Sequence, residues 1–406
     1  MRKSNSLINN LDWSLLIGFL TLISFGLMTI YSVAFNEENP SVFSFSEKYG
    51  KQIMWIFLSL FLGVVVFLID SDVYKKFALP IYIVTIGLLV LVLFMPPING
   101  ARAWIGVGSM GIQPAEFAKI TTALLLAKYV SDINLKLLSS YNILIALVII
   151  VIPMGLILLQ PDAGTFVVFT AFFFVLYREG LTFDPFILKF INLLPKVNYK
   201  NTWIGSHFIP ILFVLVFLSI LTILLGHKNL GIIPGLPLYG SFGIIVSLFL
   251  VSVLGILFIQ KFGTKREKVK VRLIIILSFI VGSASSYFVE YSFVHLADHQ
   301  KDRIELFLGL KEDPNGKDYN RNRAMAAVGS GGFSGKGYKN ASVSSVKTNH
   351  VPESETDFIF CPFAEEWGFL GGVALLMIYL FIIIRILVIA ERQRSTFNRI
   401  YAYSVG

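Results

Sequence analysis

Three acidic residues lie where the longest polar segment of this chain meets an apolar run. Asp357 comes directly before the run, and Glu365 and Glu366 fall inside it. A carboxylate in hydrocarbon costs several kcal/mol unless it is paired or hydrated, so such residues are candidates for a functional site. Asp357 suits either a general base or a cap of the following helix. The two glutamates point about 100° apart on a helix, so we expect one to pair with a basic group and support the site from beneath.

Another acidic and basic pair opens the apolar run near residue 114. Glu116 suits the positive end of the helix dipole, and Lys119 follows three residues later, so the spacing predicts a salt bridge on one helix face. Asp162 lies in a tight turn between two apolar runs, where it is expected to cap the next helix. Trp104 is typical of an aromatic anchor at a membrane interface.

Two glycine-rich stretches resemble nucleotide-binding loops, but neither has the required context. Residues 106–111 match G-x-G-x-x-G without the strand, turn and helix that a dinucleotide site needs. Residues 329–337 have Ser330 where a phosphate loop has its first glycine, and Gly337 where it has Ser or Thr. We therefore expect no nucleotide cofactor. The second stretch leaves two interpretations open: tight backbone turns, or an anion-binding group of N–H donors assisted by Lys336.

The composition is typical of a membrane protein with many spans. Of 406 residues, 55% are hydrophobic and 15% are charged, with a mean hydropathy of +0.74. A helix crosses a bilayer with about 20 apolar residues. Such runs fall at about 13–34, 51–69, 77–95, 113–131, 143–159, 163–178, 208–225, 239–260, 271–290 and 359–385. We therefore expect an all-α polytopic membrane protein with about ten transmembrane helices and one long extracytoplasmic loop.

The positions of the basic residues predict the orientation. With the N-terminus inside, the inner connections hold twenty Lys and Arg, and the short outer connections hold four, as the positive-inside rule requires. The long polar loop then lies outside, and its own basic and acidic residues balance. The net charge of +9 thus comes from inner connections and gives no reason to expect nucleic acid. The single cysteine, Cys361, excludes an intrachain disulfide and an all-cysteine metal site.

These observations divide the chain into five segments. Residues 1–180 hold the first helices and the outer motifs, and 181–270 hold an inserted pair of helices. Residues 271–290 form a further helix, 291–358 form the large outer loop, and 359–406 form a helix with a cytoplasmic end. The first apolar run exceeds the roughly 7 to 15 residues of a signal peptide, so we expect it to remain as a span.

Five motifs in this order resemble the SEDS family (shape, elongation, division and sporulation), polytopic glycosyltransferases that polymerise peptidoglycan from lipid II. The motifs occupy residues 100–104, 113–119, 160–165, 327–337 and 352–360, and residues 365–368 follow them. Residues 335–337 and 356–357 resemble the elongation members of the family more than its division members.

The resemblance implies that a sugar hydroxyl attacks the anomeric carbon of a second sugar and displaces a lipid-linked diphosphate, outside the bacterial inner membrane. This chemistry needs a base and positive charge at the leaving group. Asp357 matches the family's catalytic aspartate. Candidate substrate-binding residues are Trp104, Lys119, Arg303 and Lys336, and candidate supporting residues are Glu116, Asp162, Glu365 and Glu366.

The resemblance also implies partners and an assisting ion. The substrate would be lipid II, held beside membrane lipid, and the protein partner a single-pass penicillin-binding transpeptidase. A divalent cation, Mg or Mn, is expected to bridge phosphate oxygens if one takes part.

Three features depart from the family pattern. Residues 181–270 hold two spans that the family core lacks. Ala103 stands directly before Trp104, where the family has arginine, and Arg102 lies one place earlier. The resemblance also implies two more helices and a further outer loop beyond residue 406, so we expect this sequence to be a partial chain.

Two other function classes fit the same residues. A transporter or lipid flippase could use Glu116, Asp162, Glu365 and Glu366 as a proton relay, although no internal repeat of the kind found in transporters is evident. A non-catalytic scaffold for other cell-wall enzymes is the third reading. Movement of lipid II across vesicles without polymerisation would favour transport.

Overall fold

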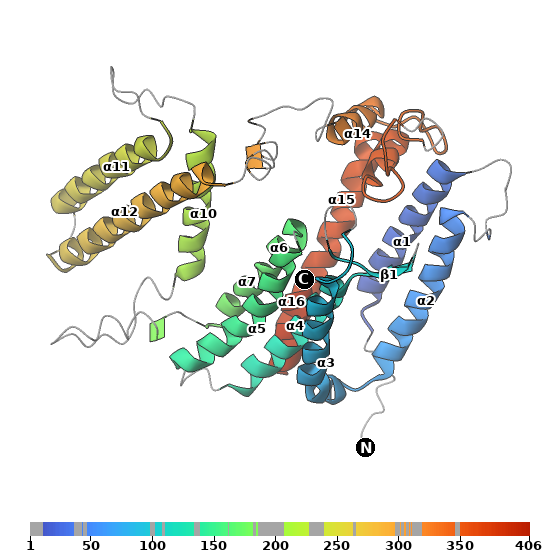
Figure 1. Cartoon of the computed structure of the whole chain (residues 1–406), viewed down its shortest axis with the longest axis horizontal. Helices are drawn as coiled ribbons and strands as arrows, with labels where there is room; N and C mark the ends of the chain where they lie inside the picture. Colours follow the sequence, from blue (N-terminus) through green and yellow to red (C-terminus); the bar gives the residue numbers. More distant parts are fainter. Residues whose placement is uncertain are drawn as a thin grey trace. The chain divides into compact units, whose positions relative to one another are not determined.

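The structure is a computed structural model, drawn in Figure 1. It describes residues 11–35, 43, 47–97, 102–107, 110–133, 139–160, 162–181, 184–185, 207–226, 239–262, 265–296, 301, 304–305, 308, 310, 319–345 and 350–406. Contacts divide the chain into two compact units. Unit 1 comprises residues 1–198 and 320–406, and unit 2 comprises residues 199–319.

Unit 1 is built of helices with one small hairpin. Its described helices are α1 (Trp13–Ala34), α2 (Lys48–Leu68), α3 (Ser71–Val92), α4 (Pro114–Asp132), α5 (Ser140–Leu159), α6 (Ala163–Phe169), α7 (Ala171–Arg178), α14 (Tyr319–Ser330), α15 (Phe360–Arg392) and α16 (Thr396–Val405). Strands β1 (Ile105–Val107) and β2 (Met110–Ile112) pair antiparallel, with Gly106 opposite Gly111. Gly106, Val107, Met110 and Gly111 of the G-x-G-x-x-G stretch thus lie in the paired strands.

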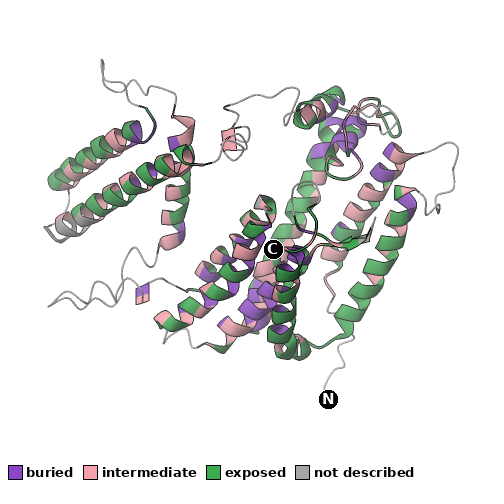
Figure 2. Cartoon of the chain, viewed as in Figure 1, coloured by how far each residue is buried: buried purple, intermediate pink, exposed green. Residues whose placement is uncertain are grey.

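The core of unit 1 is centred on α4. Its alanines at 115, 118, 123 and 127 are almost fully buried, because small residues let neighbouring membrane helices approach closely. Helices α3, α5 and α16 pack against α4. Figure 2 shows buried residues gathered on α4 and at the start of α15, whereas α2 is mostly exposed. An exposed apolar helix surface is expected in a protein that faces lipid.

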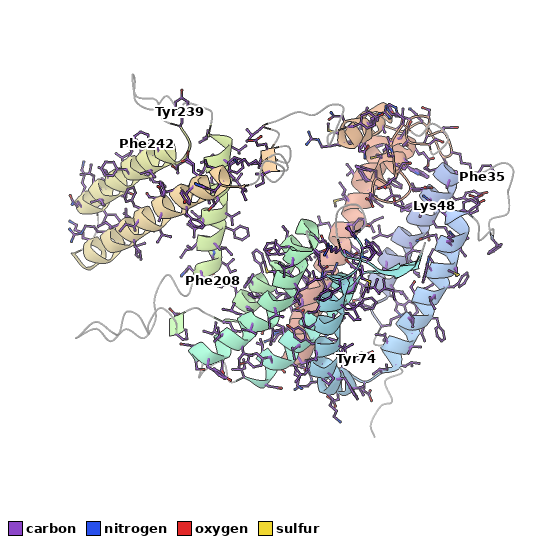
Figure 3. All side chains as sticks on the ribbon, in the orientation of Figure 1. Phe35, Lys48, Tyr74, Phe208, Tyr239 and Phe242 are labelled. Carbon is purple, nitrogen blue, oxygen red and sulfur yellow. The ribbon has the colours of Figure 1, made fainter. Side chains whose placement is uncertain are left out.

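Helix α15 consists of two parts that meet at Gly368. This glycine has φ 65° and ψ −165°, which interrupts the helix. Residues 361–366 are buried, and beyond residue 372 most of the helix faces outward. Helix α1 runs beside α15, since Arg385 pairs with Asp12 at 2.8 Å and Ser32 donates to Glu366. Figure 3 labels Phe35 and Lys48 at the end of unit 1 that carries Glu366, and Tyr74 at the opposite end.

Unit 2 contains the helices α10 (Phe208–Leu224), α11 (Gly240–Phe262) and α12 (Lys265–Val294). Helix α12 packs against both of the others. The Glu290 carboxylate of α12 accepts a hydrogen bond from the Ser241 N–H at 2.9 Å, which satisfies a free donor at the start of α11. Tyr239 and Phe242, which Figure 3 labels, flank this start.

The structure confirms the predicted all-α polytopic fold. Nine of the predicted spans each coincide with one helix, and the span 163–178 coincides with α6 and α7. In the described part seven helices are long and apolar enough to cross a membrane. The segment Gly164–Arg178, interrupted at Thr170, and α10 are shorter apolar helices. Helix α4 has 19 residues and includes four charged ones, Glu116, Lys119, Lys128 and Asp132, which makes it the least apolar of the predicted spans. The division into five segments stays a prediction.

Candidate active site

Asp357 lies on an exposed turn directly before α15. We call residues 351–359 the aspartate turn. The Glu353 carbonyl, at a residue with φ 56°, accepts from the N–H groups of Thr356 at 3.1 Å and Phe358 at 3.2 Å. The N-cap of α15 is Ile359, with no side-chain capping bond. The capping interpretation of Asp357 is therefore wrong, and its exposed carboxylate has no hydrogen-bond partner within the described residues.

Apolar contacts fix the aspartate turn against α14. Val351 and Cys361 are buried with Ala324 and Ala327 of α14, and Phe358 packs against this cluster. The residue next to Asp357 is thus anchored while Asp357 itself faces outward. Cys361 packs in this cluster as a small apolar residue.

Glu365 is enclosed by the segment that follows α14. We call residues 331–345 the glycine–serine loop. The Glu365 carboxylate is 0% exposed and pairs with Lys336 Nζ at 2.6 Å. It also accepts from three consecutive N–H groups, those of Ser342, Val343 and Ser344, each at 2.9 Å, and from the hydroxyls of both serines. These charge-assisted bonds satisfy the buried charge and close the loop over the start of α15.

This arrangement answers the question left open by the glycine-rich motif. The N–H groups of Lys336 and Gly337 donate to the carbonyls of Glu365 at 3.0 Å and Glu366 at 2.9 Å, and that of Gly335 donates to Gly331. The N–H groups of Gly331 and Gly332 likewise donate to the Val328 and Gly329 carbonyls, so four glycines of residues 329–337 have engaged N–H groups, against the anion-binding interpretation of this stretch. Successive N–H groups do surround an anion a few residues later, and the anion is Glu365 itself.

Two glycines make the close packing possible. Gly335 has φ 81°, and a Cβ there would collide with the Glu366 carbonyl. Gly368 has φ 65°, and a Cβ there would collide with the backbone of the glycine–serine loop. A residue with a side chain is disfavoured at such angles even without a collision. The break at Gly368 also keeps Glu365 and Glu366 ahead of the lipid-facing part of α15, so their carboxylates are enclosed by protein and not by hydrocarbon.

Glu366 connects the loop to α1. Its Oε1 accepts from the Ser32 hydroxyl and from the Lys339 N–H at 3.1 Å, and it is 1% exposed. The Lys339 ammonium lies 4.5 Å from the Tyr31 ring centre and 4.2 Å from that of Phe35, close enough for cation–π attraction. Burial and the nearby Glu366 carboxylate raise the pKa of Tyr338 in the same loop. Two adjacent carboxylates thus hold one loop through different partners.

The other candidate residues form a second group around the hairpin. Glu116 and Lys119 form the predicted salt bridge, at 2.8 Å. Asp162 caps α6, as predicted, by accepting from the Thr165 N–H at 3.0 Å, and it also accepts from Gln113 at 3.3 Å. Trp104 is exposed, and its ring lies against Gly111 of the hairpin.

Arg303 lies outside the described residues. Arg102 donates to the Leu93 carbonyl at 3.1 Å. Sequence reasoning missed Ser32, Lys339, Ser342 and Ser344. The two serines of the loop had a signal, because the run Ser342-Val343-Ser344-Ser345 after a glycine-rich stretch offers hydroxyls and N–H groups to a buried anion. The catalytic and substrate-binding roles assigned from the sequence stay predictions.

The described residues also bear on a metal site. Within them, no group of three or more His, Cys, Asp or Glu is placed to hold an ion. A divalent cation coordinated mainly by substrate phosphates needs only one or two protein carboxylates.

The fold and the site define a polytopic helical membrane protein with an acidic turn held at one end of its helix bundle. Comparison with known sequences identifies the family. The model of the FtsW, RodA and SpoVE family, described as cell cycle proteins, matches residues 12–204 and 239–406. The chain belongs to this family, which confirms the resemblance found in the motifs.

The relatives are named as peptidoglycan glycosyltransferases. RodA of Treponema pallidum is 30% identical over 410 residues, covering 98% of this chain and 86% of that protein. MrdB of Escherichia coli K12 is 27% identical, covering 97% and 79%. A chain of a peptidoglycan synthase complex that coordinates polymerization and crosslinking has a TM-score of 0.57 at 20% identity, covering 97% and 82%. RodA of Thermus thermophilus has a TM-score of 0.50 at 18% identity, covering 97% and 80%. Both structures share the fold of this chain.

Proposed function

We propose that this chain is a peptidoglycan glycosyltransferase that polymerises lipid II into glycan strands during cell-wall elongation. Membership of the family and the names of the full-length relatives support the activity. The observation that carries the mechanism is the position of Asp357: an exposed carboxylate on a turn that is anchored by the buried Val351 and the partly buried Phe358. Such a group is accessible to a sugar hydroxyl and is held in place by the protein.

In the proposed reaction Asp357 takes the proton of the attacking hydroxyl. The oxygen then forms a bond to the anomeric carbon of the second sugar, and the bond from that carbon to the lipid-linked diphosphate breaks. The base need not move far, because Phe358 and Val351 anchor the turn on which it lies. Accurate positioning of a reacting group is a large part of what a protein contributes to such a step.

Positive charge is needed where the diphosphate leaves. Lys336 is 29% exposed and Lys119 is 31% exposed, so both remain accessible from outside although each is paired with a glutamate. We propose Lys119 as the stronger candidate, since its partner Glu116 is 54% exposed and an exposed pair is weak and easily exchanged for a phosphate. Lys336 is tied to a fully buried carboxylate, which favours a supporting role.

The proposed site lies on the extracytoplasmic side. Asp357, the glycine–serine loop and Lys48 gather at one end of unit 1, where Lys48 pairs with Glu355. The opposite end carries residues of the basic inner connections, including Lys75, paired with Asp132 at 3.1 Å, and Arg399, paired with Glu179 at 2.6 Å. The positive-inside rule places this second end in the cytoplasm.

The partner and the ion follow from the same proposal. A single-pass penicillin-binding transpeptidase is the expected partner, because a structural neighbour is part of a synthase complex that joins polymerization to crosslinking. A divalent cation, Mg or Mn, is expected to act by bridging the substrate diphosphate.

The test is polymerisation by the purified chain with its partner, in detergent and in vesicles that carry labelled lipid II. Glycan strands detected on a gel support the proposal, with a requirement for Mg²⁺ or Mn²⁺ measured by adding a chelator. Lipid II that crosses the vesicle membrane without polymerising supports the flippase alternative. No reaction of either kind, with the partner still bound, supports the scaffold alternative.

A further inference from the structure

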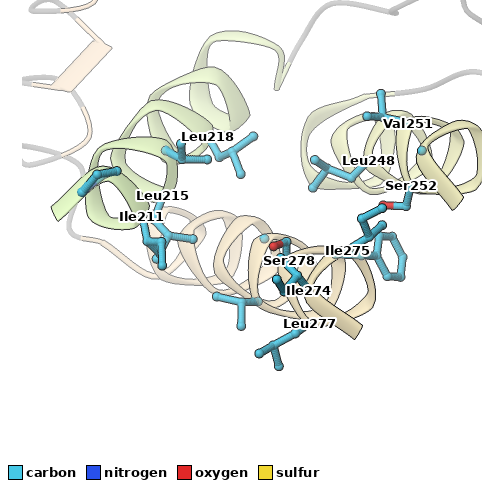
Figure 4. A pocket seen from close by; sticks show the side chains of 16 residues that line it. Ile211, Leu215, Leu218, Leu248, Val251, Ser252, Ile274, Ile275, Leu277 and Ser278 are labelled. Atoms are coloured by element: carbon cyan, nitrogen blue, oxygen red, sulfur yellow. The ribbon is translucent and has the colours of Figure 1, made fainter. Parts of the chain in front are cut away.

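The helices of unit 2 enclose an apolar groove that none of the proposed chemistry uses. It has a volume of about 480 Å³ and is lined by α10, α11 and α12 (Figure 4). Ile211, Leu215 and Leu218 come from α10, Leu248 from α11, and Ile274 from α12, with Ser252 and Ser278 as the hydroxyl-bearing residues. Sites for small molecules are commonly about 300–1,000 Å³ and mostly apolar.

Small residues create the groove. Gly255 of α11 and Gly282 of α12 both line it. A Cβ on Gly255 would lie 3.2 Å from Ile275, and one on Gly282 would lie 3.2 Å from Leu248. The missing side chains thus leave a channel between otherwise bulky helices. Its rim is open, since Val251 and Val214 line it and are 66% and 57% exposed.

Basic residues gather at the end of the groove where α11 is followed by α12. The segment 261–272 contains six Lys and Arg and one acidic residue. Arg272 precedes Ile274 of the groove by two residues, and Lys268 precedes it by six. In the described part of the chain, neither has an ion pair. This end lies on the cytoplasmic side in the orientation predicted by the charges.

We propose that the groove holds an acyl chain of an anionic phospholipid from the inner leaflet, with the lipid phosphate at Lys268 and Arg272. The apolar walls alone would not select a lipid, because chains in the bilayer are as apolar as leucine. The adjacent charge supplies the selectivity, since basic residues at a membrane surface attract anionic headgroups. The groove holds the acyl chain, and Lys268 and Arg272 hold the lipid phosphate.

This site does not depend on the proposed glycosyltransferase activity. Its α10 wall lies within residues 205–238, which separate the two stretches matched by the family model. The positive-inside rule also assigns the basic end to the cytoplasmic side, whereas the active site is proposed for the extracytoplasmic side. Loss of lipid binding and loss of polymerisation are therefore separate results.

Native mass spectrometry of the purified full chain tests the site, with phosphatidylglycerol compared to phosphatidylcholine of identical acyl chains. We expect one phosphatidylglycerol to be retained preferentially. Ser252→Phe fills the groove and should abolish its retention, whereas Leu254→Phe should not, because Leu254 is 66% exposed on the same helix and does not line the groove. Inorganic phosphate at equal concentration should not displace the lipid.

The charge variant tests the headgroup without altering the groove. Lys268→Gln with Arg272→Gln should reduce the preference for phosphatidylglycerol about 30-fold, as expected for two charges at a membrane surface. Arg392→Gln with Arg394→Gln removes equal charge from unit 1 and should leave the preference unchanged. Equal retention of both lipids by the unaltered chain, or unchanged retention by Ser252→Phe, would overturn the proposal.

Discussion

Replacement of Glu365 by glutamine tests how the loop above α15 is held. The carboxylate is 0% exposed and accepts from Lys336, from three N–H groups and from two hydroxyls. In Glu365→Gln the side-chain amide places an N–H group among donors, so at least one buried donor loses its acceptor and Lys336 loses its counter-charge. Removal of one partner of a buried ion pair costs about 3–5 kcal/mol. We expect a loss of this size, concentrated in the glycine–serine loop.

Hydrogen–deuterium exchange followed by mass spectrometry measures this effect locally. The amides of residues 342–344 should exchange at least about 100-fold faster in Glu365→Gln, since each 1.4 kcal/mol is a factor of ten. Lys336→Met leaves the fully buried Glu365 carboxylate without its counter-charge, so it should also speed the exchange of these amides. Glu391→Gln is the matched control on the same helix. The side chains of Glu391 and of its partner Arg178 are 56% and 54% exposed, so the exchange of residues 342–344 should not change. Unaltered exchange in Glu365→Gln would refute the reasoning.

Three further predictions concern the packing around the site. Gly335→Ala should destabilise the loop by more than the roughly 1–2 kcal/mol that the left-handed conformation costs a residue with a side chain. The measurement is increased proteolysis within residues 331–345. Gly329→Ala should not increase it, because a Cβ at Gly329 meets nothing within 4 Å. Ser32→Ala should cost about 1–3 kcal/mol in thermal unfolding, because the buried Glu366 Oε1 loses one of its two donors and keeps only the Lys339 N–H. The hydrogen bond from Arg385 holds the pKa of Asp12 below its ordinary value, so Asp12→Asn should lower the melting temperature at pH 6. The difference in melting temperature between the two proteins should vanish as the pH falls through the lowered pKa, because the native aspartate is then protonated as well.

The sequence was sufficient to predict the helices, because runs of about 20 apolar residues and the distribution of basic residues are strong signals. It also predicted local contacts, such as the Glu116–Lys119 pair and the Asp162 cap, since these depend on spacing of three residues. Long-range partners could not be predicted in this way. Ser32 and Glu366 are 334 residues apart, and nothing in the local pattern of either identifies the other.

The glycine-rich stretch illustrates the same limit. Its N–H groups could take part in tight turns or bind an anion. The choice depended on whether the carbonyls of α15 would come within hydrogen-bonding distance of them. The positive φ of Gly368 decides this, because the break brings the carbonyls of Glu365 and Glu366 against residues 336 and 337. A glycine after two glutamates and a tryptophan is visible in the sequence, but its backbone angle is not.

The central claim is that Asp357 takes the proton of the attacking sugar hydroxyl. The direct measurement is the single-turnover rate of glycan bond formation by the purified chain with its partner, compared for the native protein, Asp357→Asn and Glu353→Gln. Glu353 is an exposed carboxylate in the same turn, so its substitution controls for loss of charge there. We predict that Asp357→Asn reduces the rate by about 10²–10⁴-fold, as expected for loss of a general base, with residues 342–344 still protected from exchange and Glu353→Gln at the native rate. A native rate in Asp357→Asn would contradict the account.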